Sequence, residues 1–179
     1  MRSLKHFSIL ALAVLFISFG SANAQSFSTR SIEQQVNHKI LKLPYYEVFD
    51  HIAYQVNGDT VTLSGKVRNA TNKKSAERSV KSIPGVARVV NNIEILPVGG
   101  FDEGIRRSLY RQLSNTGGLS RYLWTVNPSV RLIVDRGNIS LEGYVANRGD
   151  YNTMNVVAHG VQGAFSVTNN LKIDSGRAN

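Results

Sequence analysis

The sequence predicts an α+β protein made of two tandem α-β-β-α-β modules, each a three-stranded mixed sheet packed against two helices. Two observations lead to this prediction. Residues 51–95 align with residues 129–173 at a constant offset of 78 residues and without a gap, so the chain contains an internal duplication. Within each copy, apolar residues recur at helical spacing in two segments and at alternate positions in three others.

The first helix of each copy has an amphipathic apolar stripe. Its apolar positions are Ile32, Val36, Ile40 and Leu43 in the first copy, and Ile105, Leu109 and Leu113 in the second. Ser31, with Gln34 three places on, resembles a capping box and predicts the start of the first helix, which Pro44 closes. Asp102 is the expected N-cap of the corresponding helix in the second copy.

Two alternating strands follow each first helix and should form a hairpin. The turn-forming residues 57–60 and 135–138 separate the two strands of each pair. Gly65 and Gly143 interrupt the second strand of each hairpin, where glycine marks a bulge or a close approach. We expect a helix packing across the sheet to make that approach.

A second helix and a last strand complete each copy. Ala76, Val80 and Ile83 face the core, and Gly85 and Gly163 follow the second helices, where a left-handed residue is expected. The last strand of the first copy places four side chains on one face, namely Val89, Asn91, Ile93 and Ile95. Asn91 and its repeat Asn169 are either ligand-contacting amides or amides bonded to nearby backbone, and we favour the second interpretation.

This arrangement resembles a known family. The strand that reads Val61-x-Leu63-x-Gly65-x-Val67, followed by residues 83–93 with Pro84-Gly85-Val86 and Asn91, is similar to the BON domain, named for bacterial osmotically induced and nodulation proteins. The second copy departs from the pattern, because Gln162 replaces the proline, Ala164 replaces the valine and the loop before its first strand is longer. The resemblance implies a non-enzymatic role in the cell envelope, often as phospholipid or membrane-surface binding.

The N-terminal segment predicts export. A positive start precedes a short apolar run from Ile9 to Phe19, and residues 22–24 have the small-x-small pattern that favours cleavage between Ala24 and Gln25. The alternative is an uncleaved N-terminal anchor. The chain has no cysteine, so it is not expected to be a lipoprotein. We predict a signal peptide at 1–24, BON-like domains at 30–97 and 102–174, and a linker at 98–101.

The composition excludes several functions. Removing residues 1–24 deletes two basic residues from a chain of formal charge +9, so the mature charge is +7, and export to the periplasm separates that charge from nucleic acid. His38, His51 and His159 lack partners at any metal or triad spacing. We therefore predict a protein that is not an enzyme and needs no cofactor or metal.

Two surfaces are candidates for binding. Basic residues extend from the second strand and second helix of the first copy: Lys66, Arg68, Lys73, Lys74, Arg78 and Lys81. The longer loop of the second copy carries Arg121, Tyr122 and Trp124, which suit a membrane interface. The alternatives are that the basic residues only confer solubility and that Leu123 and Trp124 are buried where the copies meet.

These surfaces predict a periplasmic envelope protein that binds anionic phospholipid or a membrane surface under osmotic or envelope stress. The alternative is a protein-interaction or chaperone-like module whose partner is an envelope protein. Each copy has only about seventy residues, and a domain of that size is marginally stable alone. We therefore expect the two copies to pack on one another.

Overall fold

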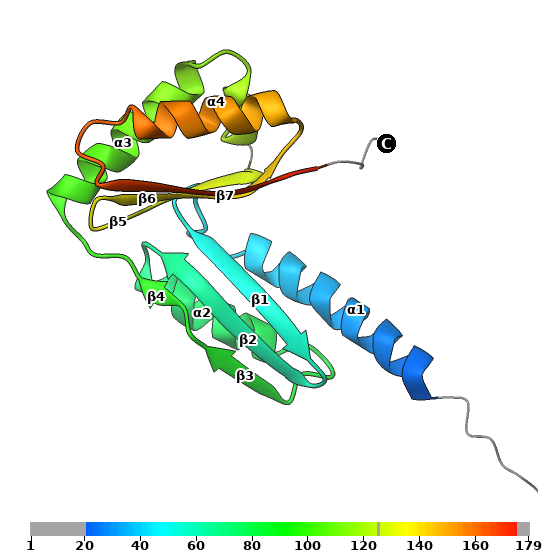
Figure 1. Ribbon diagram of the computed structural model, residues 1–179. Coiled ribbons are helices and arrows are strands. Elements are labelled where there is room, and N and C mark those ends of the chain that lie inside the picture. The colour runs from blue at the N-terminus through cyan, green and yellow to red at the C-terminus, as the bar shows by residue number, and fades with distance from the viewer. Residues whose placement is uncertain (1–20, 125, 175–179) are drawn as a thin grey trace, which may run out of the picture.

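The computed structural model describes residues 21–124 and 126–174, which fold as two copies of one module packed against each other (Figure 1). The first copy consists of α1 (Ser21–Leu41), β1 (His51–Asn57), β2 (Thr60–Val67), α2 (Ala70–Lys81), β3 (Arg88–Asn91) and β4 (Glu94–Ile95). The second consists of α3 (Gly100–Asn115), the short 3-10 helix η1 (Leu119–Tyr122), β5 (Val130–Asp135), β6 (Asn138–Val145), α4 (Arg148–His159) and β7 (Ser166–Ile173).

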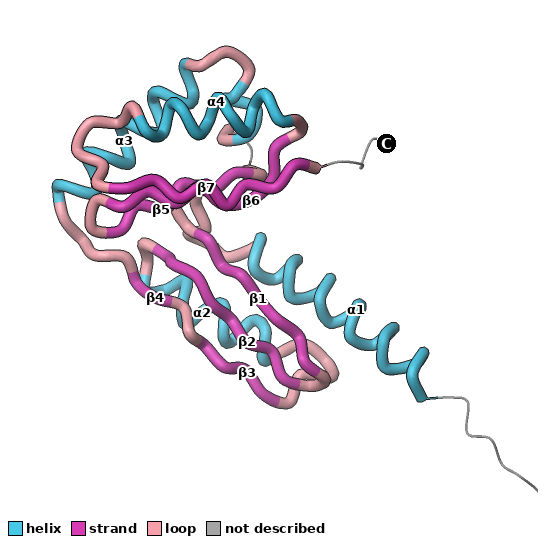
Figure 2. Tube along the Cα trace, in the orientation of Figure 1, coloured by secondary structure: helices cyan, strands magenta, loops and turns pink. Residues whose placement is uncertain are grey.

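Both sheets are mixed and have the same strand order. β1 and β2 form an antiparallel hairpin, and β3 and β4 pair parallel to β2 on its other side. β5 and β6 repeat the hairpin, and β7 lies parallel to β6. Figure 2 shows α3 and α4 together over one face of the second sheet. The predicted fold class, two tandem α-β-β-α-β modules, is confirmed.

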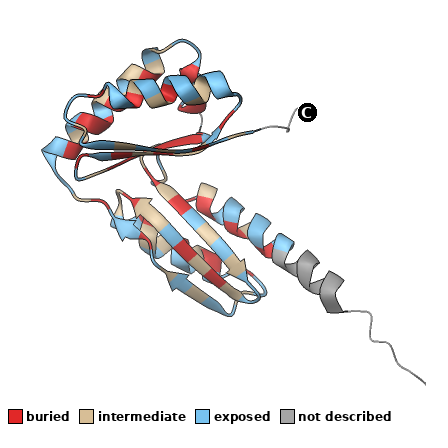
Figure 3. Ribbon diagram, in the orientation of Figure 1, coloured by how far each residue is buried: buried red, intermediate tan, exposed pale blue. Residues whose placement is uncertain are grey.

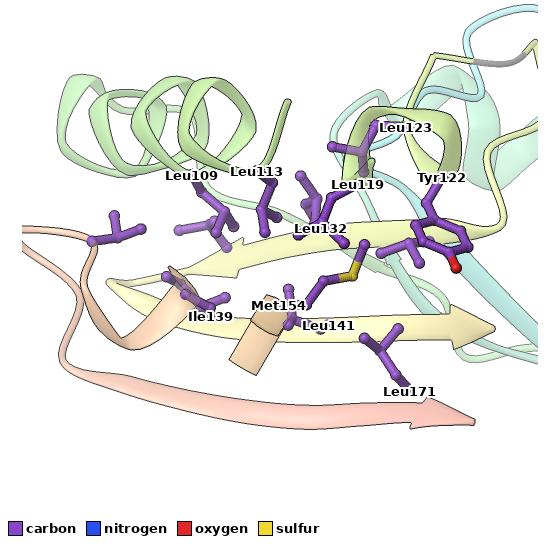
Figure 4. Close-up of a cluster of buried hydrophobic side chains, with 14 of the residues drawn as sticks. Leu109, Leu113, Leu119, Tyr122, Leu123, Leu132, Ile139, Leu141, Met154 and Leu171 are labelled. Atoms are coloured by element: carbon purple, nitrogen blue, oxygen red, sulfur yellow. The ribbon is translucent and has the colours of Figure 1, made fainter. Parts of the chain in front are cut away.

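Each copy has its own apolar core between its helices and its sheet. In the first copy, Val36 of α1, Leu63 of β2 and Val80 of α2 are fully buried. In the second, Leu109 and Leu113 of α3 lie over the sheet, as Figure 4 shows. Buried positions are interspersed with more exposed ones along β2 and β6, whereas residues 130–134 of β5 are all buried (Figure 3). Burying one such apolar side chain contributes about 1.5–3 kcal/mol.

The helix boundaries differ from the predicted ones. α1 begins at Ser21, ten residues before Ser31, because residues 21–30 contain no glycine or proline that would stop a helix. α1 ends at Leu41, before Pro44. α3 begins at Gly100, inside the predicted linker, with Gly99 as its N-cap. Asp102 is therefore not the N-cap. Its carboxylate instead accepts the backbone N–H groups of the β5–β6 turn, at 2.9 and 2.8 Å.

The two strand glycines make room for backbone and not for a helix. Gly65 and Gly143 have φ angles of +107° and +110°, a left-handed conformation that favours glycine. A side chain at Gly65 would collide with the carbonyl oxygen of His51 in the neighbouring strand, and one at Gly143 would collide with that of Ser129. The prediction that a helix approaches these glycines is wrong, because the close contact is with the neighbouring strand of the same hairpin.

The repeated asparagines have a structural role, as favoured. Asn91 donates through Nδ2 to a carbonyl of α2 at 3.0 Å and accepts from the N–H of Ile93 at 3.2 Å. Asn169 likewise accepts from the N–H of Leu171 at 3.1 Å and donates to a carbonyl of α4 at 3.4 Å. The last strand of the first copy is divided into β3 and β4, where the sequence predicted one strand, although β7 stays continuous with the equivalent asparagine bond.

The copies are joined by the segment that precedes β1. The N–H of Leu132 in β5 donates to the carbonyl of Val48 at 2.8 Å, so this segment lies along the edge of the second sheet. Val48 and Phe49 pack against the core of the second copy, and the ring of Phe49 lies 6.0 Å from that of Tyr110. The expected packing of the two copies is thus present in the structure.

A buried arginine strengthens the same junction. Arg131 of β5 is only 5% exposed. Its Nη1 donates to the carbonyl of Glu47 at 3.0 Å, and its guanidinium lies 4.3 Å from the centre of the Tyr46 ring. Burial lowers the pKa of the Arg131 guanidinium from its ordinary value, because a buried charge loses its hydration.

Candidate functional site

Unpaired positive charge gathers on the helical layer of the first copy. α1 and α2 pack side by side over one core, and their outer surface defines what we call the basic helical face. Its members are Arg30, Lys39, Lys42, Lys73, Lys74, Arg78 and Lys81. The same surface carries two acidic residues, Glu33 and Glu77, so its net charge is +5. By comparison, α3 and α4 carry four arginines and three acidic residues, which gives a net charge of +1.

The local sequence places the α2 side chains on this face. The side chain of Asn69 accepts the N–H of Thr71 at 2.8 Å and so caps the helix. Ala76 and Val80, four residues apart, turn one side of α2 into the core. The lysines and the arginine of α2 lie on the other side, where three are exposed and Lys73 is half-buried. Within the described residues, none of the four forms a salt bridge.

Lys66 and Arg68, predicted beside them, lie elsewhere. Lys66 pairs with Asp135 of the second copy and lies 3.7 Å from Glu94. Arg68 pairs with two glutamates, at 3.3 and 3.0 Å, the nearer of which is Glu103 in α3. Both side chains therefore bridge the two copies. Strand alternation indicated which face they share, but it could not show that the second copy covers that face.

The aromatic loop of the second copy is divided between core and surface. Tyr122 is 6% exposed, and its hydroxyl donates to Asp150 at 2.6 Å. Arg121 also pairs with Asp150 and lies over the Tyr122 ring. Leu123 is buried in the second core and borders a junction cavity, as the alternative predicted, but Trp124 is 69% exposed. Trp124 therefore remains at the surface of this loop, together with the half-exposed Arg121.

In each copy a side chain accepts the backbone N–H that follows the second strand of the hairpin. We call this arrangement the polar clasp, and different residues form it in the two copies. In the first copy Asp50 accepts the N–H of Arg68 at 2.6 Å and the amide of Asn72 at 3.2 Å. In the second, the hydroxyl of Tyr122 accepts the N–H of Ala146, the residue 78 positions after Arg68, at 3.0 Å. Burial raises the pKa of the Asp50 carboxyl. These groups are bonded to their own module, so they serve the fold.

The histidines of the described part of the chain belong to no cluster that could hold a metal ion. Across residues 21–124 and 126–174, no group of three histidine or acidic side chains could hold a metal ion. His51 lies at the junction, where burial lowers the pKa of its imidazole although Glu142 opposes the shift. No described helix is long and apolar enough to span a bilayer.

A groove between the copies was not anticipated from the sequence. This junction groove has a volume of about 690 Å³ and lies among the segment before β1, the start of α2, residues 95–100 and the start of α3. Its apolar lining includes Tyr45, Ile95 and Val98, which are 54%, 49% and 99% exposed. Ionic side chains, Arg68 and Glu103 among them, complete the lining.

An exposed aromatic pair lies outside the lining of this groove, at the β5–β6 turn. Phe101 follows Gly100, a lining residue, and its ring lies 5.5 Å from that of Phe165. The two rings are 55% and 74% exposed. Only the apolar character of each residue was visible in the sequence, because 64 residues separate the two.

Comparison with known proteins identifies both copies. The family model for the BON domain matches residues 28–97 and again residues 101–175. No curated protein matches the chain. Two solved structures of CdsD, a structural protein of the type III secretion system of Chlamydia trachomatis, are similar at 16% identity. One covers 79% of this chain and 91% of that chain with a TM-score of 0.29. The other, the C-terminal domain, covers 78% and 96% with a TM-score of 0.28.

Proposed function

The chain belongs to the BON-domain family in both of its copies, and from this premise we propose that it attaches to anionic phospholipid surfaces through its basic helical face. The family is associated with the envelope and with phospholipids and is generally non-enzymatic. The observation that carries the proposal is the net charge of +5 on the basic helical face, in which the four basic residues of α2 have no ionic partner among the described residues.

Electrostatics gives the expected strength. A basic residue close to an anionic membrane contributes about 1 kcal/mol, so the four basic residues of α2 together contribute up to about 4 kcal/mol at low salt. The attraction falls off over a Debye length of about 10 Å at 0.1 M salt, so the attachment is peripheral and reversible. Trp124 supplies a separate exposed aromatic contact that suits the polar interface of a bilayer.

The proposed location is the periplasm. Cleavage between Ala24 and Gln25 would remove the predicted signal peptide, of which residues 1–20 lie outside the described part of the chain, and would start the mature protein within α1. The mature chain would then consist of domains 30–97 and 102–174 joined by residues 98–101. A role in osmotic or envelope stress accords with the family resemblance.

Vesicle binding tests this proposal. The mature protein is sedimented with vesicles of phosphatidylglycerol and phosphatidylcholine at rising salt. The variant K73Q/K74Q/R78Q/K81Q should bind at least tenfold more weakly, since its helix has lost four positive charges. The matched control R88Q/R107Q/R111Q/K172Q loses the same charge from four exposed residues outside the basic helical face, and it should bind nearly as well as the unmodified protein.

The two variants distinguish binding through the basic helical face from binding that depends only on the total net charge. Equal losses in the two variants would mean that net charge alone governs binding, and the assignment to α1 and α2 would be wrong. Binding that is absent at low salt would overturn the lipid proposal altogether. Retention of envelope proteins together with indifference to vesicles would favour the alternative function, a protein-interaction or chaperone-like module.

A further inference from the structure

Three of the ten large apolar side chains that are exposed in the described chain line one concave feature. These three are Tyr45, Ile95 and Val98, and the concave feature is the junction groove. Exposed apolar side chains scattered singly need no explanation, but a concentration of them marks a surface that is covered by something else.

The charges of the groove are already engaged with one another. Arg68 is held by Glu47 at 3.3 Å and by Glu103 at 3.0 Å. Arg106, whose side chain is 3% exposed, lies 3.5 Å from Glu103 and donates to a carbonyl of β5 at 2.6 Å. Asp50 is 1% exposed and accepts only groups of its own module. No cation of the described lining is left to hold a phosphate, and each paired charge would resist a second partner.

Shape and charge together separate this surface from the proposed lipid contact. The basic helical face carries unpaired cations, whereas the junction groove is a hollow of about 690 Å³ with a net lining charge of −1 from two arginines and three acidic residues. An anionic bilayer is repelled by such a lining and is too flat to fill it. A hollow of this volume is within the usual size range of binding clefts and takes a few side chains.

We infer that the junction groove binds a short, uncharged apolar segment of a partner protein, at a surface independent of the membrane contact. Ile95, Val98 and Tyr45 would cover the apolar side chains of that segment, and the paired ions beneath them would exclude charged residues, because a buried charge without a partner is costly. Both copies contribute to the groove, so it exists only in the joined pair.

A defined peptide tests the inference. The probe is a fluorescein-labelled nonapeptide, GSLVSLVSG, titrated with the mature two-copy protein and followed by fluorescence anisotropy. Companion peptides place glutamate or lysine at the central serine, or replace each leucine and valine with serine. The variant I95S/V98S changes two exposed side chains, so it should fold normally. V126S/V156S changes two other exposed valines, 92% and 70% accessible, outside the groove lining.

The inference expects saturable binding of GSLVSLVSG that is at least tenfold weaker for I95S/V98S and unchanged for V126S/V156S. Both charged peptides should bind at least threefold more weakly, and the all-serine peptide should not bind. I95S/V98S should still sediment with anionic vesicles, which keeps this test separate from that of the proposed function. Absence of peptide binding, equal loss in both variants, or loss of vesicle binding in I95S/V98S would overturn the inference. So would concentration-dependent self-association abolished by I95S/V98S, since a second copy would then be the occupant.

Discussion

Substitution of Arg131 by alanine should weaken the junction of the two copies. The side chain is 5% exposed, donates to the carbonyl of Glu47 at 3.0 Å and lies 4.3 Å from the centre of the Tyr46 ring. A hydrogen bond from a charged group contributes about 1.5–3 kcal/mol, and a desolvated cation–π contact contributes up to about 2 kcal/mol. The unfavourable burial of the charge, visible in the lowered pKa of Arg131, offsets part of this sum.

We expect a net loss of about 2 kcal/mol, which corresponds to a fall of about 4–8 °C in Tm for a chain of this size. Differential scanning calorimetry measures it, and it should also show whether one cooperative transition of the unmodified protein separates into two when the junction is weakened. Arg107→Ala is the matched control, because Arg107 is exposed on α3 and makes no recorded ionic contact within the described chain. An unchanged Tm for Arg131→Ala, or an equal loss for Arg107→Ala, would refute the account of the junction.

Three other predictions concern the fold and its pH response. Gly65→Ala should lower the free energy of unfolding by about 1–3 kcal/mol because of its positive φ angle, and by more because the new side chain collides with the neighbouring strand. Gly58 also has a positive φ angle but open space around it, so Gly58→Ala measures the first contribution alone in urea unfolding. Tyr122→Phe should cost about 1–3 kcal/mol in the same assay, because the N–H of Ala146 and the carboxylate of Asp150 each lose a partner. The lowered pKa of His51 means that the unfolded chain binds its proton more readily, so stability should be full above the ordinary value of 6.5 and fall as the pH drops through it. His51→Gln should flatten that part of the pH profile.

Each of these predictions has a contrary result. Equal losses for Gly65→Ala and Gly58→Ala would mean that the close approach within the hairpin is relieved at no cost. A neutral Tyr122→Phe would mean that water replaces the hydroxyl. A stability that is constant between pH 7 and 5, or a slope retained in His51→Gln, would remove His51 as the source of the pH response.

The sequence predicted those features that depend on local periodicity. Alternation of Val61, Leu63 and Val67 located a strand, and the spacing of Ala76 and Val80 located the inner side of α2, because these patterns follow directly from strand and helix geometry. The start of α1 was placed ten residues late, since the capping-box pattern at Ser31 is not decisive when the preceding residues also favour a helix.

Features that depend on the contact between copies could not be predicted. The periodicity placed Lys66 on a polar face of its strand, but its partner Asp135 is 69 residues away. The junction groove likewise arises from segments that are distant in the sequence. Within the second copy, the contact of Phe101 with Phe165 also joins segments that are distant in the sequence. The duplication also concealed the exchange of Asp50 for Tyr122 in the polar clasp, because Tyr122 comes from the longer loop that only the second copy has.

The most direct test of the membrane proposal uses the absence of cysteine, which makes any introduced cysteine a unique labelling site. Ser75→Cys on α2 and Thr153→Cys on α4 occupy equivalent positions at the 78-residue offset, and each is labelled with an environment-sensitive fluorophore. On addition of phosphatidylglycerol vesicles at low salt, we predict a blue shift for the label on α2, reversed by salt, and none for the label on α4. A shift at Thr153→Cys without one at Ser75→Cys would contradict the assignment of membrane binding to the basic helical face.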